Sequence, residues 1–166
     1  SRWDGLILTF AIGRRITKKD CRFMVTTPEM KGLQGWFLKR LGCFSINQQS
    51  PSMYSLRYAI DLILSKNQLV IFPEGKINKN GKAVKLKEGL FRLARLARKK
   101  GDPIKIVPIG IAYSRINPKF RDRFALCVEK PLNLDDFSSS SINEFNSSLI
   151  KNIKKAELKA LTLVGR

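Results

Sequence analysis

The chain contains no histidine among its 166 residues. Imidazole can therefore supply neither a general base nor a metal ligand within these residues. The three cysteines, Cys21, Cys43 and Cys127, are odd in number and form no Cys-x-x-Cys pair, which argues against a disulfide framework and against a zinc knuckle. We therefore expect reduced thiols, a reducing compartment and no metal site.

Long apolar runs are also missing. No run approaches the 18 or more residues of a membrane-spanning helix, and the run at residues 6–12 is far too short. Gly13-Arg14-Arg15 follows it where a cleavable signal peptide would have small residues. Because the chain begins at Ser1 without methionine, we expect a fragment or a processed product, and a signal or anchor could lie upstream.

Acidic residues are scarce. Thirteen Asp and Glu stand against 32 Lys and Arg, which gives a net charge of +19. An anionic partner follows from this imbalance, and nucleic acid, anionic lipid headgroups and acidic carrier proteins all qualify. An apolar fraction of 43% over 166 residues is typical of one globular domain, so we predict a single domain over residues 1–166.

Hydrophobic periodicity predicts alternating helices and strands. Residues 4–12 fit a helix or a short strand, and Asp4 at their start favours the helix. The succession of a strand at 69–72, a helix from Lys85 and a strand at 104–113 predicts a βαβ unit. The expected fold is α/β, with a mixed, largely parallel central sheet flanked by helices. Further elements are expected as strands at 21–27, 43–47 and 124–129, and as helices at 31–42, from Ser50-Pro51 and from a capping box at 141–144.

The expected helix at 31–42 is amphipathic. Leu33, Trp36, Phe37 and Leu41 recur near one face, and the helix also carries Lys39 and Arg40. The favoured interpretation is that the aromatic residues pack on a core. The alternative is contact with a membrane interface.

A second stretch, residues 69–76, contains an acid that packing does not explain. Leu69-Val70-Ile71-Phe72 runs into Pro73, Glu74, Gly75 and Lys76, which is typical of a buried strand that ends in a tight loop. Loops at the carboxyl ends of strands are where α/β proteins bind ligands. Glu74 is therefore a candidate site residue.

Four blocks together resemble the lysophosphatidic acid (1-acylglycerol-3-phosphate) acyltransferases and their glycerolipid relatives. The resemblance covers residues 1–113 in the family's order. It is most specific in the Phe-Pro-Glu-Gly block and the later Val-Pro block. The four blocks are Phe72-Pro73-Glu74-Gly75, Val107-Pro108-Ile109, Gly42-Cys43-Phe44-Ser45-Ile46 and, at the start of the chain, Arg2-Trp3-Asp4. The helix that joins the first two blocks matches through Lys87-Glu88-Gly89 and Leu93-Ala94-Arg95.

The family's catalytic motif is a histidine, four residues and an aspartate. Asp4 fits the aspartate, so the histidine would stand two residues before Ser1, and the residues given would lack the base. The resemblance implies that this histidine takes the proton of the acceptor hydroxyl. Asp4 would fix its tautomer and support the imidazolium.

The resemblance further implies an acceptor-binding site at Phe72, Pro73, Glu74, Gly75 and Lys76. Two departures from the family concern its phosphate clamp. Asn47-Gln48-Gln49 stands where the family usually has arginine, and Lys76-Ile77 stands where it often has Thr-Arg. Gln48 is included among the substrate-binding candidates, and the acceptor could be a different lysolipid.

The implied function is O-acyl transfer from acyl-CoA or acyl-carrier protein to a lysophospholipid such as 1-acylglycerol-3-phosphate, in phospholipid biosynthesis. No cofactor is expected beyond the donor thioester. The expected location is an anionic membrane surface facing the cytoplasm or an equivalent reducing organelle compartment. The alternative is a non-catalytic basic module that binds nucleic acid or anionic membrane, although nothing resembles a helix-turn-helix, an RNA-recognition motif or a zinc finger.

Overall fold

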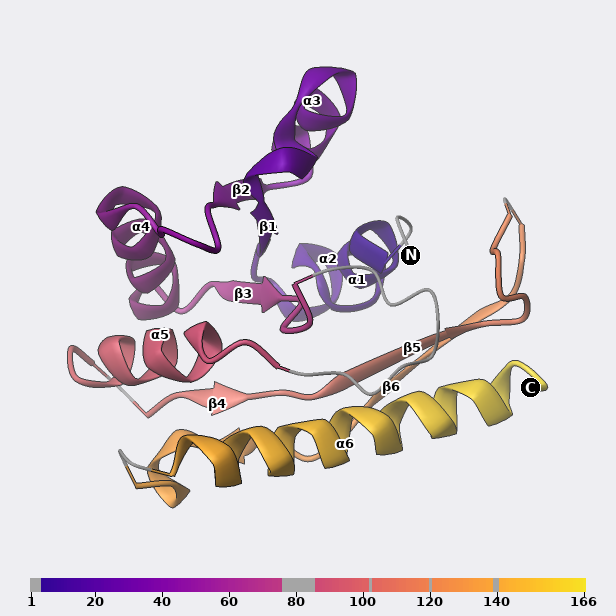
Figure 1. Ribbon diagram of the computed structural model, residues 1–166. Coiled ribbons are helices and arrows are strands. Elements are labelled where there is room, and N and C mark those ends of the chain that lie inside the picture. The colour runs from indigo at the N-terminus through magenta and orange to yellow at the C-terminus, as the bar shows by residue number, and fades with distance from the viewer. Residues whose placement is uncertain (1–3, 76–85, 102, 120, 139–140) are drawn as a thin grey trace. The chain divides into compact units, whose positions relative to one another are not determined.

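The computed structural model of the chain describes residues 4–75, 86–101, 103–119, 121–138 and 141–166 (Figure 1). Contacts divide the chain into two compact units, residues 2–102 and 103–166, and each unit has its own strands and core. The expectation of one domain over residues 1–166 stays a prediction. The mixed α/β fold class is confirmed, since a parallel sheet, antiparallel pairs and flanking helices are all present.

The first unit is built on three parallel strands. Their order is β2-β1-β3, with β1 in the centre. In this register Phe23 of β1 lies opposite Cys43 on one side and Val70 on the other. Because the strands are parallel, their carboxyl ends lie at one edge of the sheet. The strands are β1 (Cys21–Thr26), β2 (Cys43–Ile46) and β3 (Gln68–Ile71).

Helices accompany this sheet through short connections. Residues 4–12 form a helix, as Asp4 at their start predicts. The start of α4 differs from the prediction: Ser52, not Ser50, is the N-cap, and its side chain accepts a hydrogen bond from the Ser55 backbone N–H at 3.1 Å. The helical elements are α1 (Asp4–Ile12), α2 (Arg14–Thr17), the 3-10 helix η1 (Thr27–Met30), α3 (Gly32–Arg40), α4 (Met53–Leu64) and α5 (Gly89–Arg98).

The core of this unit draws on the sheet and on α1, α4 and α5. Phe23 of the central strand is one of the largest fully buried side chains. Helices α4 and α5 pack against each other, and the helix predicted from Lys85 begins at Gly89 instead. Their buried apolar residues are Ala59, Ile60 and Leu62 from α4, and Phe91, Leu93, Ala94 and Ala97 from α5.

Helix α3 contradicts the favoured interpretation of its aromatic residues. Leu33, Trp36 and Phe37 are 88%, 57% and 47% exposed, so they do not pack on a core. Gly35 is the buried residue of this helix. Periodicity located the apolar face correctly, but it cannot tell which face of a helix meets the rest of the protein.

The second unit pairs strands in antiparallel fashion against one long helix. Strand β5 (Ile109–Tyr113) pairs with β6 (Phe124–Val128), and α6 (Ile142–Leu163) packs along both. The capping box predicted at the start of α6 does not form a side-chain cap, because the Ser141 hydroxyl lies 2.6 Å from that of Ser138 instead. The remaining elements are β4 (Lys105–Ile106), which pairs with β7 (Leu132–Asn133), and the 3-10 helix η2 (Leu134–Asp136).

The single strand predicted at 104–113 is wrong, because it divides at Val107-Pro108 into β4 and β5. Proline has no N–H to donate to a ladder, and Pro108 is fully buried where the two strands change partners. Its carbonyl accepts the Glu129 backbone N–H at 3.0 Å. The βαβ relation of β3 to this segment connects the two units and stays a prediction.

Candidate active site

The loops that follow β2 and β3 meet at the carboxyl edge of the parallel sheet. Gln48 follows β2, Gly75 follows β3, and the Gln48 Nε2 donates a hydrogen bond to the Gly75 carbonyl at 3.3 Å. The two residues are 27 positions apart in the sequence. The structure thus brings together two of the blocks that the sequence analysis singled out separately.

Gly75 has the backbone geometry that this contact requires. Its φ is +68°, and its N–H donates to the Phe72 carbonyl at 3.0 Å, which closes a tight turn over Phe72–Gly75. A Cβ on Gly75 would lie 2.5 Å from the Gln48 Nε2. Only glycine adopts this conformation at this distance without strain. The Gln48 side chain therefore lies close to the backbone at Gly75, and the close approach of an acceptor at this residue stays a prediction.

The same turn is tied to the segment before α5. The Pro73 carbonyl accepts a hydrogen bond from the Lys87 backbone N–H at 3.0 Å. Glu74 lies between Pro73 and Gly75 and is half-buried, while Phe72 is 37% exposed. The Lys87 side chain is exposed beside this turn, so Lys87 joins the site as a cation that the sequence analysis placed only in the joining helix. Lys76 lies outside the described residues.

Asn47 shapes the loop that carries Gln48. Its Oδ1 accepts hydrogen bonds from the backbone N–H groups of Gln49 and Ser50, at 3.0 and 3.4 Å. This is an Asx turn, in which the side-chain oxygen takes the place of a backbone carbonyl and accepts the N–H of the residue two positions later. Asparagine directly after a strand is the signal that could have revealed this role in the sequence.

Asp4 belongs to the same unit but to a different element. It stands in the first turn of α1, is half-buried, and α1 packs against the central strand β1. An acid in the first turn of a helix is favoured by the helix dipole, which accounts for this position without any reaction. The histidine expected as its partner would precede Ser1, and the catalytic role of Asp4 stays a prediction.

Two thiols lie near this sheet, and both are poor nucleophiles. Burial raises the pKa of Cys43 to about 11, and burial together with the charge of Asp20 raises the pKa of Cys21. The thiolate is the reactive form of cysteine, and little of it exists at neutral pH when the pKa is high. A covalent acyl-cysteine at either residue is therefore unfavourable.

In the described part of the chain, no three or more His, Cys, Asp or Glu residues gather where they could hold a metal ion. A helix long and apolar enough to cross a membrane is likewise not found in that part.

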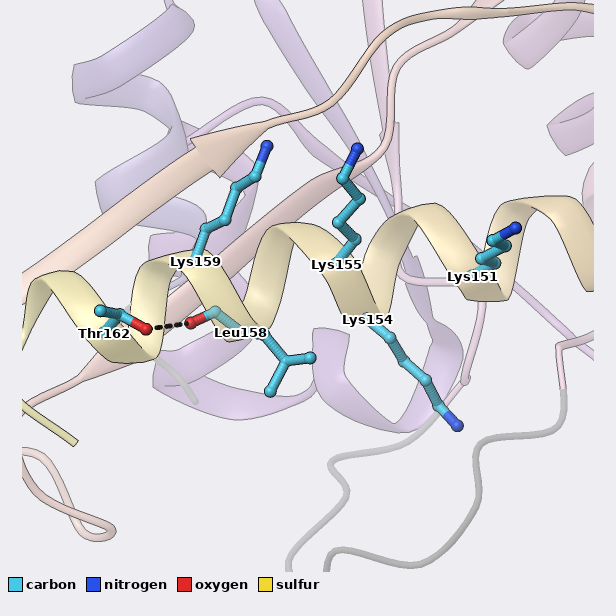
Figure 2. Close-up of a pocket in the computed structure, with 6 residues that line it drawn as sticks. All are labelled: Lys151, Lys154, Lys155, Leu158, Lys159 and Thr162. Carbon is cyan, nitrogen blue, oxygen red and sulfur yellow. Dashed lines mark hydrogen bonds between the residues drawn. The ribbon is translucent and has the colours of Figure 1, made fainter.

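A hollow in the second unit has a different character. It has a volume of about 530 Å³ and lies along one face of α6 (Figure 2). Lys155 and Lys159 point to the same side of the helix and both bind the carboxylate of Glu129, the Lys155 Nζ at 3.1 Å. Because these lysines are engaged in ion pairs that attach α6 to the end of β6, we do not assign the hollow to the reaction. Its lining is Lys151, Lys154, Lys155, Leu158, Lys159 and Thr162.

Comparisons with known proteins place the chain in a family. A family model described as Acyltransferase matches residues 1–112, which include Asp4, Gln48 and the Phe72–Gly75 turn. A curated relative, the 1-acyl-sn-glycerol-3-phosphate acyltransferase of Streptococcus pneumoniae, is 26% identical over 110 residues, 64% of this chain and 36% of the relative. The chain thus spans about a third of that relative's length.

A solved structure also resembles the chain. It is the 1-acyl-sn-glycerophosphate (LPA) acyltransferase PlsC from Thermotoga maritima, with a TM-score of 0.51 and 22% identity. The match covers 87% of this chain and 57% of that one. At this identity the likeness establishes the fold.

Proposed function

The chain belongs to the Acyltransferase family, and we propose that it transfers a fatty acyl group from a thioester to the hydroxyl of a lysophospholipid such as 1-acylglycerol-3-phosphate. One observation carries the proposal: the hydrogen bond between Gln48 and Gly75 joins two family-like blocks at the carboxyl edge of the sheet. The name of the pneumococcal relative supports the acceptor class.

In the proposed reaction, a histidine two positions before Ser1 takes the proton of the acceptor hydroxyl. The alkoxide attacks the thioester carbonyl, an ester C–O bond forms, and the C–S bond breaks. The thiolate that leaves is protonated by the imidazolium. Asp4 would hold the imidazole in the required tautomer and stabilise its charged form.

The residues at the sheet edge would bind the acceptor. Gln48 and Lys87 surround the Phe72–Gly75 turn, and Lys76 follows it directly in the sequence. A Gln amide and lysine point charges recognise a phosphate less rigidly than a bidentate arginine fork does. We therefore propose that this site accepts a broader range of lysolipid headgroups than an arginine clamp would.

The donor and the location belong to the same proposal. The donor is acyl-CoA or acyl-carrier protein, and no cofactor beyond that thioester is required. A net charge of +19 supports an anionic membrane surface that faces the cytoplasm or another reducing compartment. Synthesis of phospholipids is the proposed process.

The decisive experiment measures acyl transfer by full-length protein. Labelled acyl-CoA and labelled acyl-carrier protein are each offered with a panel of lysolipids, and the expected product is the diacyl lipid. The residue two positions before Ser1 is expected to be histidine. A different residue at that position would contradict the proposed reaction. Absence of turnover, together with tight, salt-sensitive binding of RNA or DNA, would do the same, and either result would favour the non-catalytic basic module.

A further inference from the structure

Helix α3 presents an apolar face to solvent. Leu33, Trp36 and Phe37 lie at i, i+3 and i+4 spacing, so they share one side of the helix. Their exposed fractions of 88%, 57% and 47% place three large apolar side chains together in water. A contiguous exposed apolar patch marks an interaction site, whereas single exposed apolar residues are ordinary.

The opposite face of α3 is fixed against the protein. The helix packs on η1 and β2, and a Cβ at the buried Gly35 would lie 2.1 Å from the Met30 carbonyl oxygen. Gln34 Nε2 also donates to the Glu29 carboxylate at 2.6 Å. This packing holds α3 with its apolar face outward.

Cations stand at both ends of α3. Lys31 precedes the helix, and Lys39 and Arg40 occupy its last turn. The Arg40 guanidinium lies over the Trp36 ring, 4.2 Å from its centroid. A stacked pair of this kind keeps a cation and an indole side by side, which is the combination found where a protein meets lipid headgroups.

We propose that α3 is the surface by which this protein binds an anionic phospholipid bilayer. Leu33, Trp36 and Phe37 enter the boundary between headgroups and acyl chains, and Lys39 and Arg40 contact the lipid phosphates. The proposal deepens the proposed function, because it depends on a substrate that resides in a bilayer. The new part of the proposal is that α3 is the element that makes the contact with the bilayer.

The topology supports this assignment. Helix α3 follows η1, which begins directly after the carboxyl end of β1 at Thr26. The start of α3 therefore lies near the edge of the sheet where Gln48 and Gly75 meet. A bilayer on this face would present a lysolipid close to that edge.

Charge favours a bilayer over a second copy of the chain. Two copies that met through α3 would bring Lys31, Lys39 and Arg40 of each copy close together, and like charges in contact are unfavourable. Anionic headgroups are complementary to the same residues. Self-association is therefore an alternative outcome of the test.

The first test reports on Trp36 directly. The sequence has two tryptophans, so Trp3→Phe leaves Trp36 as the single indole. With vesicles of phosphatidylcholine and phosphatidylglycerol, its emission should shift to the blue and be quenched by brominated acyl chains. Vesicles of phosphatidylcholine alone should give a much smaller change. Binding to the mixed vesicles without any change at Trp36 would overturn the proposal, as would a lipid-free shift that depends on protein concentration.

The second test compares matched variants by vesicle co-sedimentation. Leu33→Ser and Phe37→Ser should each weaken binding, whereas Leu158→Ser, a leucine on α6 whose 65% exposure lies between theirs, should not. Lys39→Gln and Arg40→Gln should each weaken it by about fivefold, which corresponds to about 1 kcal/mol per cation. Lys154→Gln on α6 is the control for charge. Equal losses in the α3 and α6 variants would mean that charge alone, and not α3, mediates binding.

The third test separates this proposal from the proposed function. The third test uses full-length protein throughout, because the residues given would lack the proposed base. With a double variant, Leu33→Ser and Phe37→Ser, turnover of vesicle-embedded lysolipid should fall at least about fivefold, while turnover of a water-soluble short-chain lysolipid is retained. Unchanged turnover on vesicles would overturn the role of α3. Absence of turnover in the unaltered protein, with the Trp36 shift still present, would overturn the acyltransferase assignment and leave the bilayer surface in place.

Discussion

Gln48 and Gly75 depend on each other at the scale of single residues. The Gln48 amide reaches the Gly75 carbonyl because Gly75 has no side chain at φ +68° and because Asn47 turns the loop that carries Gln48. Sequence comparison with the family marks Gln48 as a departure from arginine. The structure gives this residue a positioning role at the carboxyl end of β3, which a motif by itself does not reveal.

Gly75→Ala tests that dependence. The new Cβ would have to displace the Gln48 amide, and the positive φ costs an L-residue about 1 kcal/mol or more. We expect a small loss of stability in chemical denaturation and a larger loss of kcat/KM, because the turn that carries Glu74 must shift. Gly89→Ala, where a Cβ meets nothing within 4 Å, is the matched control. Wild-type kinetics in Gly75→Ala would show that the turn does not hold the acceptor.

Asp4→Asn and Glu74→Ala test the two acids of the proposed reaction. Asp4→Asn removes the charge that would support an imidazolium, and Glu74→Ala removes the only acid in the Phe72–Gly75 turn. Each should lower turnover at least about tenfold in full-length protein. Because both residues are only half-buried, circular dichroism and the melting temperature should change little. Wild-type turnover in both variants would refute the site assignment.

At the scale of elements, small residues decide how closely α6 approaches the β5-β6 pair. Ala112, Ala156 and Ala160 are buried between them, and Gly110 of β5 meets the backbone of α6 itself. Glycine is unusual inside a strand because it offers no side chain to pack, and Gly110 stands inside β5. Its reason lies in a residue 47 positions away, Glu157, whose backbone N would be 2.2 Å from a Cβ at Gly110.

Gly110→Ala should therefore be strongly destabilising. The added methyl group meets helix backbone, which cannot rotate away as a side chain can, so β5 and α6 must separate. We expect a loss of about 3 kcal/mol in the free energy of unfolding, at the upper end for overpacking. Urea denaturation followed by circular dichroism measures it. A loss no larger than that of Gly89→Ala would mean that α6 does not rest on β5 in solution.

At the scale of the whole molecule, the sequence predicts the individual helices and strands better than it predicts how they pair and pack. Periodicity predicts the helices α1, α4, α5 and α6 and the strands β1, β2, β3 and β6. An element that buries one face repeats apolar residues at a fixed spacing, and that spacing is visible in a short stretch of sequence. The division of residues 104–113 and the outward face of α3 do not follow. The division depends on strands that come later in the sequence, β7 for β4 and β6 for β5. The orientation of α3 depends on the close contact of Gly35 with the Met30 carbonyl, which the apolar pattern of the helix does not reveal.

The same limit applies to the site. The Phe72–Gly75 turn and Asp4 are recognisable from family-like motifs, which fix residue types at short spacing. The pairing of Gln48 with Gly75, and of Lys87 with Pro73, joins loops across the sheet edge. The sequence places Lys87 in the joining helix, and only the structure shows its hydrogen bond to the Phe72–Gly75 turn.

Glu129 is a buried acid in a molecule whose net charge is +19, and its ion pairs can be tested by pH. A glutamate in an unfolded chain has a pKa near 4.3. Hydrogen bonds lower the pKa of Glu129 below that value, and the bond from Lys159 contributes more than the bond from Lys155. A lowered pKa in the folded state means that the ion pairs stabilise the protein above the unfolded pKa. That stabilisation is lost as the pH falls through the folded pKa.

Glu129→Gln removes this charge while it keeps the side-chain size. The variant should melt at a lower temperature than the unaltered protein at neutral pH, because two lysines on α6 lose their partner and the excess positive charge grows by one. The difference should shrink as the pH falls below about 4 and vanish once the wild-type carboxylate is protonated. Glu157→Gln changes an exposed acid on α6, the helix that carries the two lysines, and should show little difference from the unaltered protein at any pH. Scanning calorimetry across that pH range measures both, and a difference between Glu129→Gln and wild type that stays constant with pH would show that the ion pairs contribute nothing to folding.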